Sequence, residues 1–246
     1  MIMTALSYID YDMTDRPIKP LAVSISPNWS ETFPGAHIGL LLVEGVDNIP
    51  RPNPLDAQKR NLEDELRRRY AGMQRPDLVQ LPILNAYRQY YKRFEKTYHV
   101  QLQLESVLLA GKSLPSVSPL VDACFAAELE SLLLTASHDA GLLQPPVSID
   151  VSTATDEITQ LNGTARALKP GDMVMRDAGG VVCSVIYGQE RDSAVTATTR
   201  DALYVTYVPA GITASEVADH QKKIAANIQL FAPEARLAYR IVYSAG

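Results

Sequence analysis

Cysteine and histidine are scarce in this chain of 246 residues, which contains two cysteines and four histidines. Cys124 and Cys183 stand in apolar surroundings without the close spacing of metal ligands, so we expect buried, reduced thiols. No two histidines are spaced as HxH or HxxxH, which leaves a metal site without support. The sequence therefore favours a protein with neither a metal nor another cofactor.

Long apolar runs and an excess of basic residues are missing as well. No run approaches the roughly 20 residues that a membrane-spanning helix needs, and the first residues lack the basic and apolar segments of a signal peptide. The formal net charge of −5 argues against a broad nucleic-acid surface, and so against DNA as a partner. A local patch could still touch one end of an RNA. We expect a soluble, cytoplasmic protein with no membrane partner.

The first half of the chain is rich in helix signals. A buried strand is expected at 38–46, followed by a helix that Asn53 caps and Pro54 opens. On that helix the basic run 67–69 follows three acidic residues by four positions each. This spacing favours a paired, solvent-facing surface over an RNA contact.

An aromatic stripe marks the next helix, which is expected at about 84–98. Apolar and aromatic residues recur there at spacings of three and four, which is typical of a face packed into a core. They are Leu84, Tyr87, Tyr91, Phe94 and Tyr98. The basic residues of the segment are left for its other faces, where they are candidates for RNA contact: Arg88, Lys92, Arg93 and Lys96.

The remaining elements predict the fold class. Helices are expected at about 101–110 and 118–134, and after Pro145-Pro146 strands dominate, at 147–151, 157–161, 172–176, 181–187, 203–208 and 236–244. Thr213 and Glu216 form a capping box for a helix to about Leu230. A helix-rich segment (36–140) and a strand-rich segment (147–246) predict the α+β class. Because helices pack around strands from both, we expect one interleaved domain over residues 1–246.

The central helix and the residues after it carry the first polar candidates. Asp122 lies in its first turn, where it either favours the positive helix end or borders a pocket. His138 and Asp139 follow the helix and form either a polar pair facing a cleft or an exposed helix end.

Two further polar candidates lie in the strand-rich half. The segment 187–199 is its densest polar cluster and is either a ligand-binding loop or a plain surface hairpin. It offers Gln189, Glu190 and Asp192 for hydrogen bonds. His220 falls on the polar side of the last helix and is expected to be solvent-exposed.

Several short motifs share the order found in a known family. Leu114-Pro115 and PLVD (119–122) follow GLLLVEGVDN (39–48) and NAYRQYYKRF (85–94), and precede PGD (170–172) and TRDAL (199–203). In this order they resemble the editing domain of the phenylalanyl-tRNA synthetase β subunit of bacteria, the B-three/B-four domain, and its freestanding relatives. The similarity covers about residues 36–230. It implies layered helices around a β-sandwich-like sheet system.

The resemblance also implies a function. The synthetase domain hydrolyses tyrosine mistakenly attached to the phenylalanine tRNA, with an ordered water in a pocket between its two modules. By resemblance this chain is an aminoacyl-tRNA hydrolase acting in trans, whose partner is a tRNA acceptor end or a small amino-acid-like ligand. Together with the polar candidates named above, we expect Asp122, His138 and Asp139 around its pocket for catalysis and Ser118, Gln189, Glu190 and Asp192 for substrate binding.

Some polar positions of the family pattern hold other residues here. By resemblance its threonine and asparagine fall on Cys124 and Phe125, and its histidine falls on Ala136. A replaced buried polar group changes which substrate fits, because unpaired polar atoms are costly. A non-catalytic module that binds an amino acid, a metabolite or RNA is therefore the alternative. A third interpretation is a partner-binding relic of a synthetase subunit.

Overall fold

A central antiparallel sheet of five strands organises the computed structural model, which describes residues 6–10 and 21–246. The strand order is β1-β12-β3-β11-β4, and every neighbouring pair is antiparallel. The strands are β1 (Leu6–Asp10), β3 (His37–Glu44), β4 (Leu134–Asp139), β11 (Ala202–Val208) and β12 (Arg236–Ser244). Because β3 and β4 pair with β11, distant parts of the chain share one sheet.

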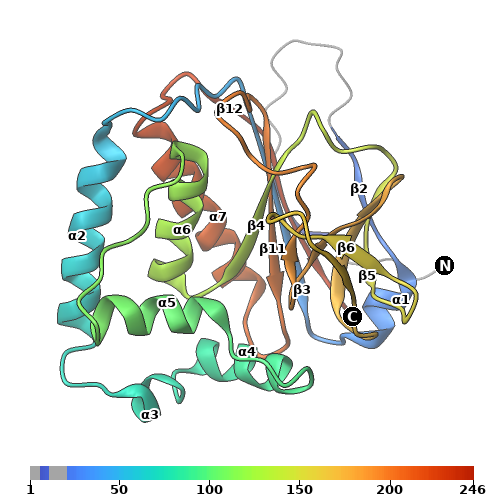
Figure 1. Ribbon diagram of the computed structural model, residues 1–246, viewed down its shortest axis with the longest axis horizontal. Helices are drawn as coiled ribbons and strands as arrows, with labels where there is room; N and C mark the ends of the chain where they lie inside the picture. Colours follow the sequence, from blue (N-terminus) through green and yellow to red (C-terminus); the bar gives the residue numbers. More distant parts are fainter. Residues whose placement is uncertain (1–5, 11–20) are drawn as a thin grey trace.

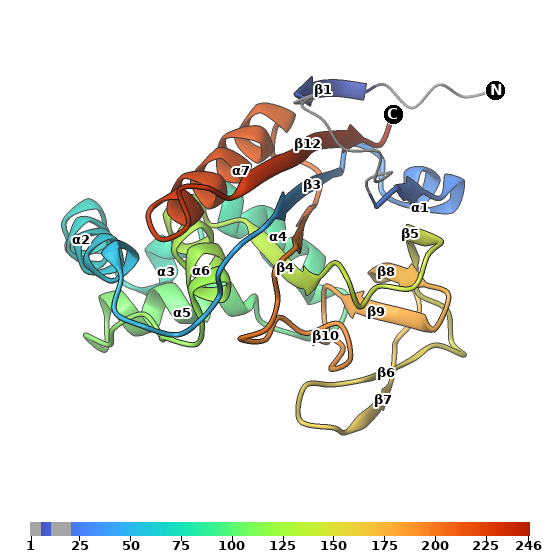
Figure 2. The ribbon, with the colours of Figure 1, turned by 90° about the horizontal axis from the view of Figure 1, so that it is seen from above.

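A second five-stranded sheet, of order β10-β9-β8-β5-β2, lies on the far side of the central sheet from α7 (Figure 2). Its strands are β2 (Val23–Ile25), β5 (Val147–Val151), β8 (Met173–Asp177), β9 (Gly180–Ser184) and β10 (Gly188–Gln189). A separate hairpin of β6 (Glu157–Thr159) and β7 (Ala165–Ala167) projects beyond it. The α+β class predicted from the sequence is confirmed.

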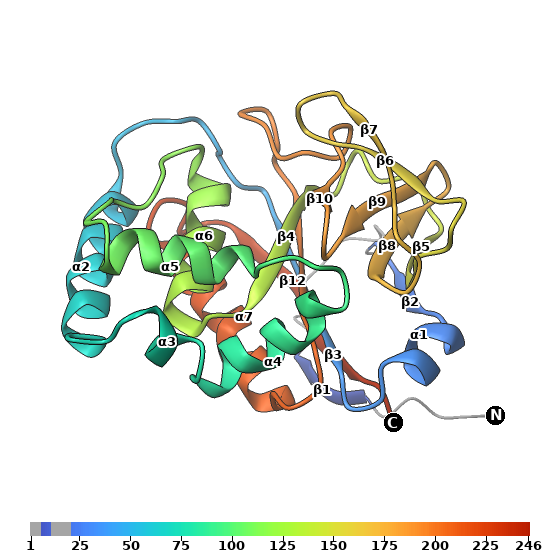
Figure 3. The ribbon, with the colours of Figure 1, turned by 60° about the horizontal axis from the view of Figure 1, so that its bottom comes forward.

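Helices cover the other side of the central sheet (Figure 1). α2, α6 and α7 lie there, while α4 and α5 run across the lower end of the molecule (Figures 1 and 3). The helices are α1 (Pro27–Thr32), α2 (Pro54–Arg69), α3 (Arg75–Leu78), α4 (Pro82–Lys92), α5 (His99–Leu108), α6 (Pro119–Ser131) and α7 (Ala214–Gln229). Among the described residues, no helix is long and apolar enough to cross a membrane.

The two predicted helix caps are confirmed, and two predicted helix ends are wrong. Asn53 caps α2 and Thr213 caps α7, each with a complete capping box. The α4 helix ends at Lys92 instead of near residue 98, and the chain turns where Glu95 has a φ of 58°. The α6 helix ends before Leu132, whose φ of 63° is left-handed, and the apolar run continues as β4.

Tyrosine hydroxyls of α4 join this helix to both sheets. Tyr87 donates to the carbonyl of Tyr207 on β11 (2.7 Å), and Tyr91 donates to the carbonyl of Val185, directly after β9 (2.9 Å). Tyr90 donates to the buried carboxylate of Asp172 in the PGD motif (2.5 Å). The aromatic stripe is therefore core, as its spacing predicts, and all five of its residues are buried.

Candidate functional site

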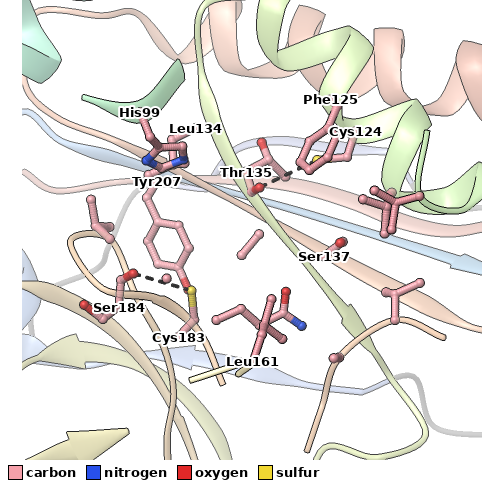
Figure 4. A pocket seen from close by; sticks show the side chains of 18 of the residues that line it. His99, Cys124, Phe125, Leu134, Thr135, Ser137, Leu161, Cys183, Ser184 and Tyr207 are labelled. Carbon is pink, nitrogen blue, oxygen red and sulfur yellow. Dashed lines mark hydrogen bonds between the residues drawn. The ribbon is translucent and has the colours of Figure 1, made fainter. Parts of the chain in front are cut away.

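A cavity of about 440 Å³ opens where α5, α6, the outer edge of β4 and the β9–β10 hairpin meet. Figure 4 shows Cys124 and Phe125 of α6 on one side of it, and Tyr207, Cys183 and Ser184 on the other. β10 lies beside β4 (Figures 2 and 3), and an isolated β-bridge joins His138 to Ala194 nearby. The site thus lies between the two sheets, at the end of the central one.

The wall of the cavity is mainly apolar. Among its lining residues there is no Asp, Glu, Lys or Arg, and the polar groups are hydroxyls, thiols, two glutamine amides and the exposed His99. The apolar lining consists of Val117, Val121, Phe125, Leu134, Ala136, Leu161, Val185, Ala194 and Val195. Such a lining suits an uncharged ligand group, because an unpaired charge would lose its hydration there.

Thr135, at the start of β4, is held from three directions. Its backbone N–H donates to Glu128 Oε1 (2.7 Å), and its carbonyl accepts from the Cys124 thiol (3.6 Å). Its hydroxyl lies 2.6 Å from Nε2 of His220. Burial raises the pKa of Glu128 to about 8, so this carboxyl is neutral at pH 7.

His220 is completely buried, so its predicted exposure is wrong. α7 packs against both the central sheet and α6, and His220 faces α6. Ser131 donates to the Ala127 carbonyl (2.7 Å) and therefore accepts from Nδ1 of His220 (2.6 Å). Nε2 is then the acceptor for Thr135. Burial lowers the pKa of His220 to about 3, which keeps the ring neutral, as this Thr135–His220–Ser131 chain requires.

Ser137 is one of the residues of the cavity wall with an unpartnered polar atom among the described residues, beside Gln103 (Oε1) and Tyr207 (hydroxyl). It is 9% exposed and lines the cavity, and its hydroxyl has no hydrogen-bond partner among the described residues. Ser184, in contrast, donates to Asp172, and Thr135 is fully engaged. Nothing in the sequence singles out Ser137, because an isolated serine in a strand has no motif.

Ser118 and Asp122 lie in a second cavity of about 290 Å³, at the start of α6. Asp122 forms a buried ion pair with Lys59 (2.7 Å) and accepts from the N–H of Val117 (2.8 Å). Ser118 accepts from the side chain of Asn48 (3.3 Å). Neither residue lines the 440 Å³ cavity.

Of the other predicted site residues, the structure brings only Gln189 into the lining of the 440 Å³ cavity. His138 is buried, with Nδ1 2.8 Å from the Ser193 hydroxyl, and burial lowers its pKa to about 3. Asp139 accepts from the Thr199 hydroxyl (2.7 Å). Both hold the segment after β10 against the end of β4.

Glu190 and Asp192 lie in that segment. Glu190 accepts from the backbone N–H groups of Asp192 (2.9 Å) and Ser193 (2.6 Å), which shapes the turn. Asp192 is exposed and pairs with Arg191 (3.1 Å). Both cysteines are buried, as predicted, and both line the cavity. Burial raises the pKa of each thiol.

The structure is a mixed α+β fold with an apolar cavity between its two five-stranded sheets. The chain belongs to the B3/4 domain family, whose model matches residues 85–232, more than half of its length. This confirms the resemblance seen in the motifs. Cys124, Phe125 and Ala136, which the resemblance in the motifs leads us to expect at polar positions of the family pattern, all line the cavity.

Among solved structures, the chain is similar to an N-terminal fragment of the phenylalanyl-tRNA synthetase β subunit from Pyrococcus horikoshii. The two are 9% identical with a TM-score of 0.43, over 89% of this chain and 52% of that one. The chain thus spans about half the length of this fragment. The search of curated proteins found no match.

Proposed function

We propose that this protein is an aminoacyl-tRNA hydrolase that acts in trans, in the cytoplasm, on esters of uncharged, mainly apolar amino acids. The cavity carries this proposal: its volume of about 440 Å³ suits a small ligand, and its wall is apolar. Membership of the B3/4 family supports the tRNA-related part. A charged amino-acid side chain would lie there without a partner, which disfavours it.

Hydrolysis of an aminoacyl ester needs only modest catalysis from the protein. An aminoacyl ester is an activated bond, so a placed water and a donor to the carbonyl oxygen are enough. The hydroxyl of Ser137, which lines the cavity, serves as the donor to the carbonyl oxygen. Water adds to the ester carbonyl and releases a proton to solvent, the bond to the ribose oxygen breaks, and that oxygen leaves with a proton from solvent.

In this proposal, one of the predicted site residues contacts the substrate and the others position the cavity wall. Gln189 contacts the substrate, and its Nε2 is already fixed by the Ser193 carbonyl (3.3 Å). His138, Asp139 and Glu190 position the wall that Ser137 and Gln189 share. Asp122 fixes the loop before α6, which includes the lining residue Val117.

A panel of aminoacyl-tRNAs tests the proposal through release of the amino acid. We expect turnover of apolar members, with Ser137→Ala lowering kcat about 100-fold, as loss of one such donor does. Ser215→Ala, on the exposed surface of α7, is the matched control. If no member of the panel is hydrolysed faster than in buffer, the protein is not this enzyme. Preference for charged aminoacyl groups would refute the substrate class alone.

One observation favours a non-catalytic binding module as the second candidate. Among the described residues, no carboxylate or lysine lines the cavity, and its one histidine, His99, has Nδ1 3.1 Å from the hydroxyl of Tyr91. A free apolar amino acid would then bind without turnover. Calorimetric titration with such amino acids, together with the panel above, separates the two functions.

A further inference from the structure

Positive charge is concentrated in the helix-rich segment that precedes α6. Residues 51–112 contain twelve Lys and Arg against seven Asp and Glu, although the whole chain has 23 against 28. The formal charge of this segment is therefore opposite to that of the chain. The overall net charge of −5 hides a positively charged region.

Within this region, three cations on and after α4 are free of acidic partners. Arg88, Lys92 and Lys96 are exposed, and none of them forms an ion pair with a described residue. Arg67 and Arg69 on α2, in contrast, pair with acidic residues of their own helix. Glu95, the one acidic residue of 82–98, pairs with Lys169 (3.3 Å). Cations without acidic partners can bind phosphates without first breaking an ion pair within the protein.

These cations stand on a rigid support close to the cavity. Tyr87 and Tyr91, each one position before a cation on α4, are buried and hydrogen-bonded to the two sheets. Lys96 comes three residues before His99, which lines the cavity, so their Cα atoms are at most about 11 Å apart. A polyanion lying along α4 would therefore reach the α5 end of the cavity.

We propose that Arg88, Lys92 and Lys96 bind the phosphates of the RNA strand whose acylated end enters the cavity. This rests on the proposed function for the identity of the RNA. A membrane surface is disfavoured, because membrane-binding helices expose large apolar residues and the aromatic residues of α4 are buried. The three side chains give affinity without sequence preference, since phosphate contacts do not read bases.

The salt dependence of RNA binding, measured on the full chain, tests this stripe of three cations, Arg88, Lys92 and Lys96. The probe is a fluorescent, non-acylated RNA hairpin with a single-stranded 3′ end, followed by anisotropy from low to moderate salt. The triple change R88Q/K92Q/K96Q should lower the slope of log K against log salt by about 2 to 3, as three lost phosphate contacts predict. The control R200Q/K222Q/R236Q removes the same charge from exposed cations elsewhere and should leave the slope within about 1 of the unchanged protein.

An unchanged slope in the stripe variant overturns the proposal, as does an equal loss in the control. Equal binding of a poly-glutamate peptide, with the same slope, would also overturn it, because the surface would then not favour RNA. Hydrolysis of an aminoacyl ester without RNA separates this inference from the proposed function. If the ester is hydrolysed but the triple change leaves the salt slope unaffected, only the phosphate-binding role of the three cations is refuted. A lowered slope with no hydrolysis of any ester refutes only the enzyme.

Discussion

Replacing Glu128 by glutamine should change how the stability of this protein depends on pH. The pKa of Glu128 rises from 4.5 to about 8 in the fold because the carboxyl is buried. Between these values the folded protein keeps a proton that the unfolded chain releases, so stability falls as the pH rises. Below pH 4.5 both states are protonated and nothing is lost. Glu128→Gln keeps the acceptor for the Thr135 N–H and removes the titration.

The size of the effect follows from the shift. One pKa unit corresponds to about 1.4 kcal/mol, so the wild-type protein should lose about 3 kcal/mol relative to Glu128→Gln between pH 5 and pH 7. Urea denaturation of both proteins at pH 5, 6, 7 and 8 measures the difference in the free energy of unfolding. Glu157→Gln, at an exposed position, is the control. A difference between wild type and Glu128→Gln that stays constant over this range would refute the buried, neutral carboxyl.

Three further changes test the packing around the site. Tyr87→Phe leaves the Tyr207 carbonyl and the Leu134 N–H unpaired and should cost about 2–4 kcal/mol of unfolding free energy. Tyr187→Phe removes a hydroxyl that has no hydrogen-bond partner among the described residues and should cost little. Lys59→Met should cost about 3–5 kcal/mol because it leaves Asp122 charged and buried, and adding Asp122→Asn should restore much of this in denaturant titrations. The pKa of His138 falls from 6.5 to about 3, so stability drops as the pH falls through this window, by up to about 1.4 kcal/mol per pH unit. His138→Asn should reduce the slope there by this one contribution, while His220, whose pKa is lowered in the same way, keeps its own. An unchanged slope would contradict the prediction.

Local signals predicted the elements better than their ends. The caps Asn53 and Thr213 act through neighbouring residues, so the sequence alone locates the starts of α2 and α7. The end of α6 could not be found in this way, because the apolar run passes from helix to strand through Leu132. His220 was misjudged because α7 contacts two layers, and a helical periodicity that assumes one buried face misses the second.

The cavity shows the same limit for the site. Its wall comes from α5, α6, β4 and the β9–β10 hairpin, and only the fold brings these elements together. Of the predicted residues, Gln189 is in the lining, while Asp122 and Asp139 are taken up by contacts with Lys59 and Thr199. Polar residue type alone could not separate a ligand contact from a structural hydrogen bond.

The Thr135–His220–Ser131 chain has a consequence for the evolution of the family. Each group in it donates in one direction only, so a change at one position leaves a buried donor or acceptor unpaired at the next. A relative in which His220 is replaced by an apolar residue should therefore also carry apolar or small residues at the positions of Thr135 and Ser131. The three positions should be inherited as a set, whatever amino acid the cavity accepts.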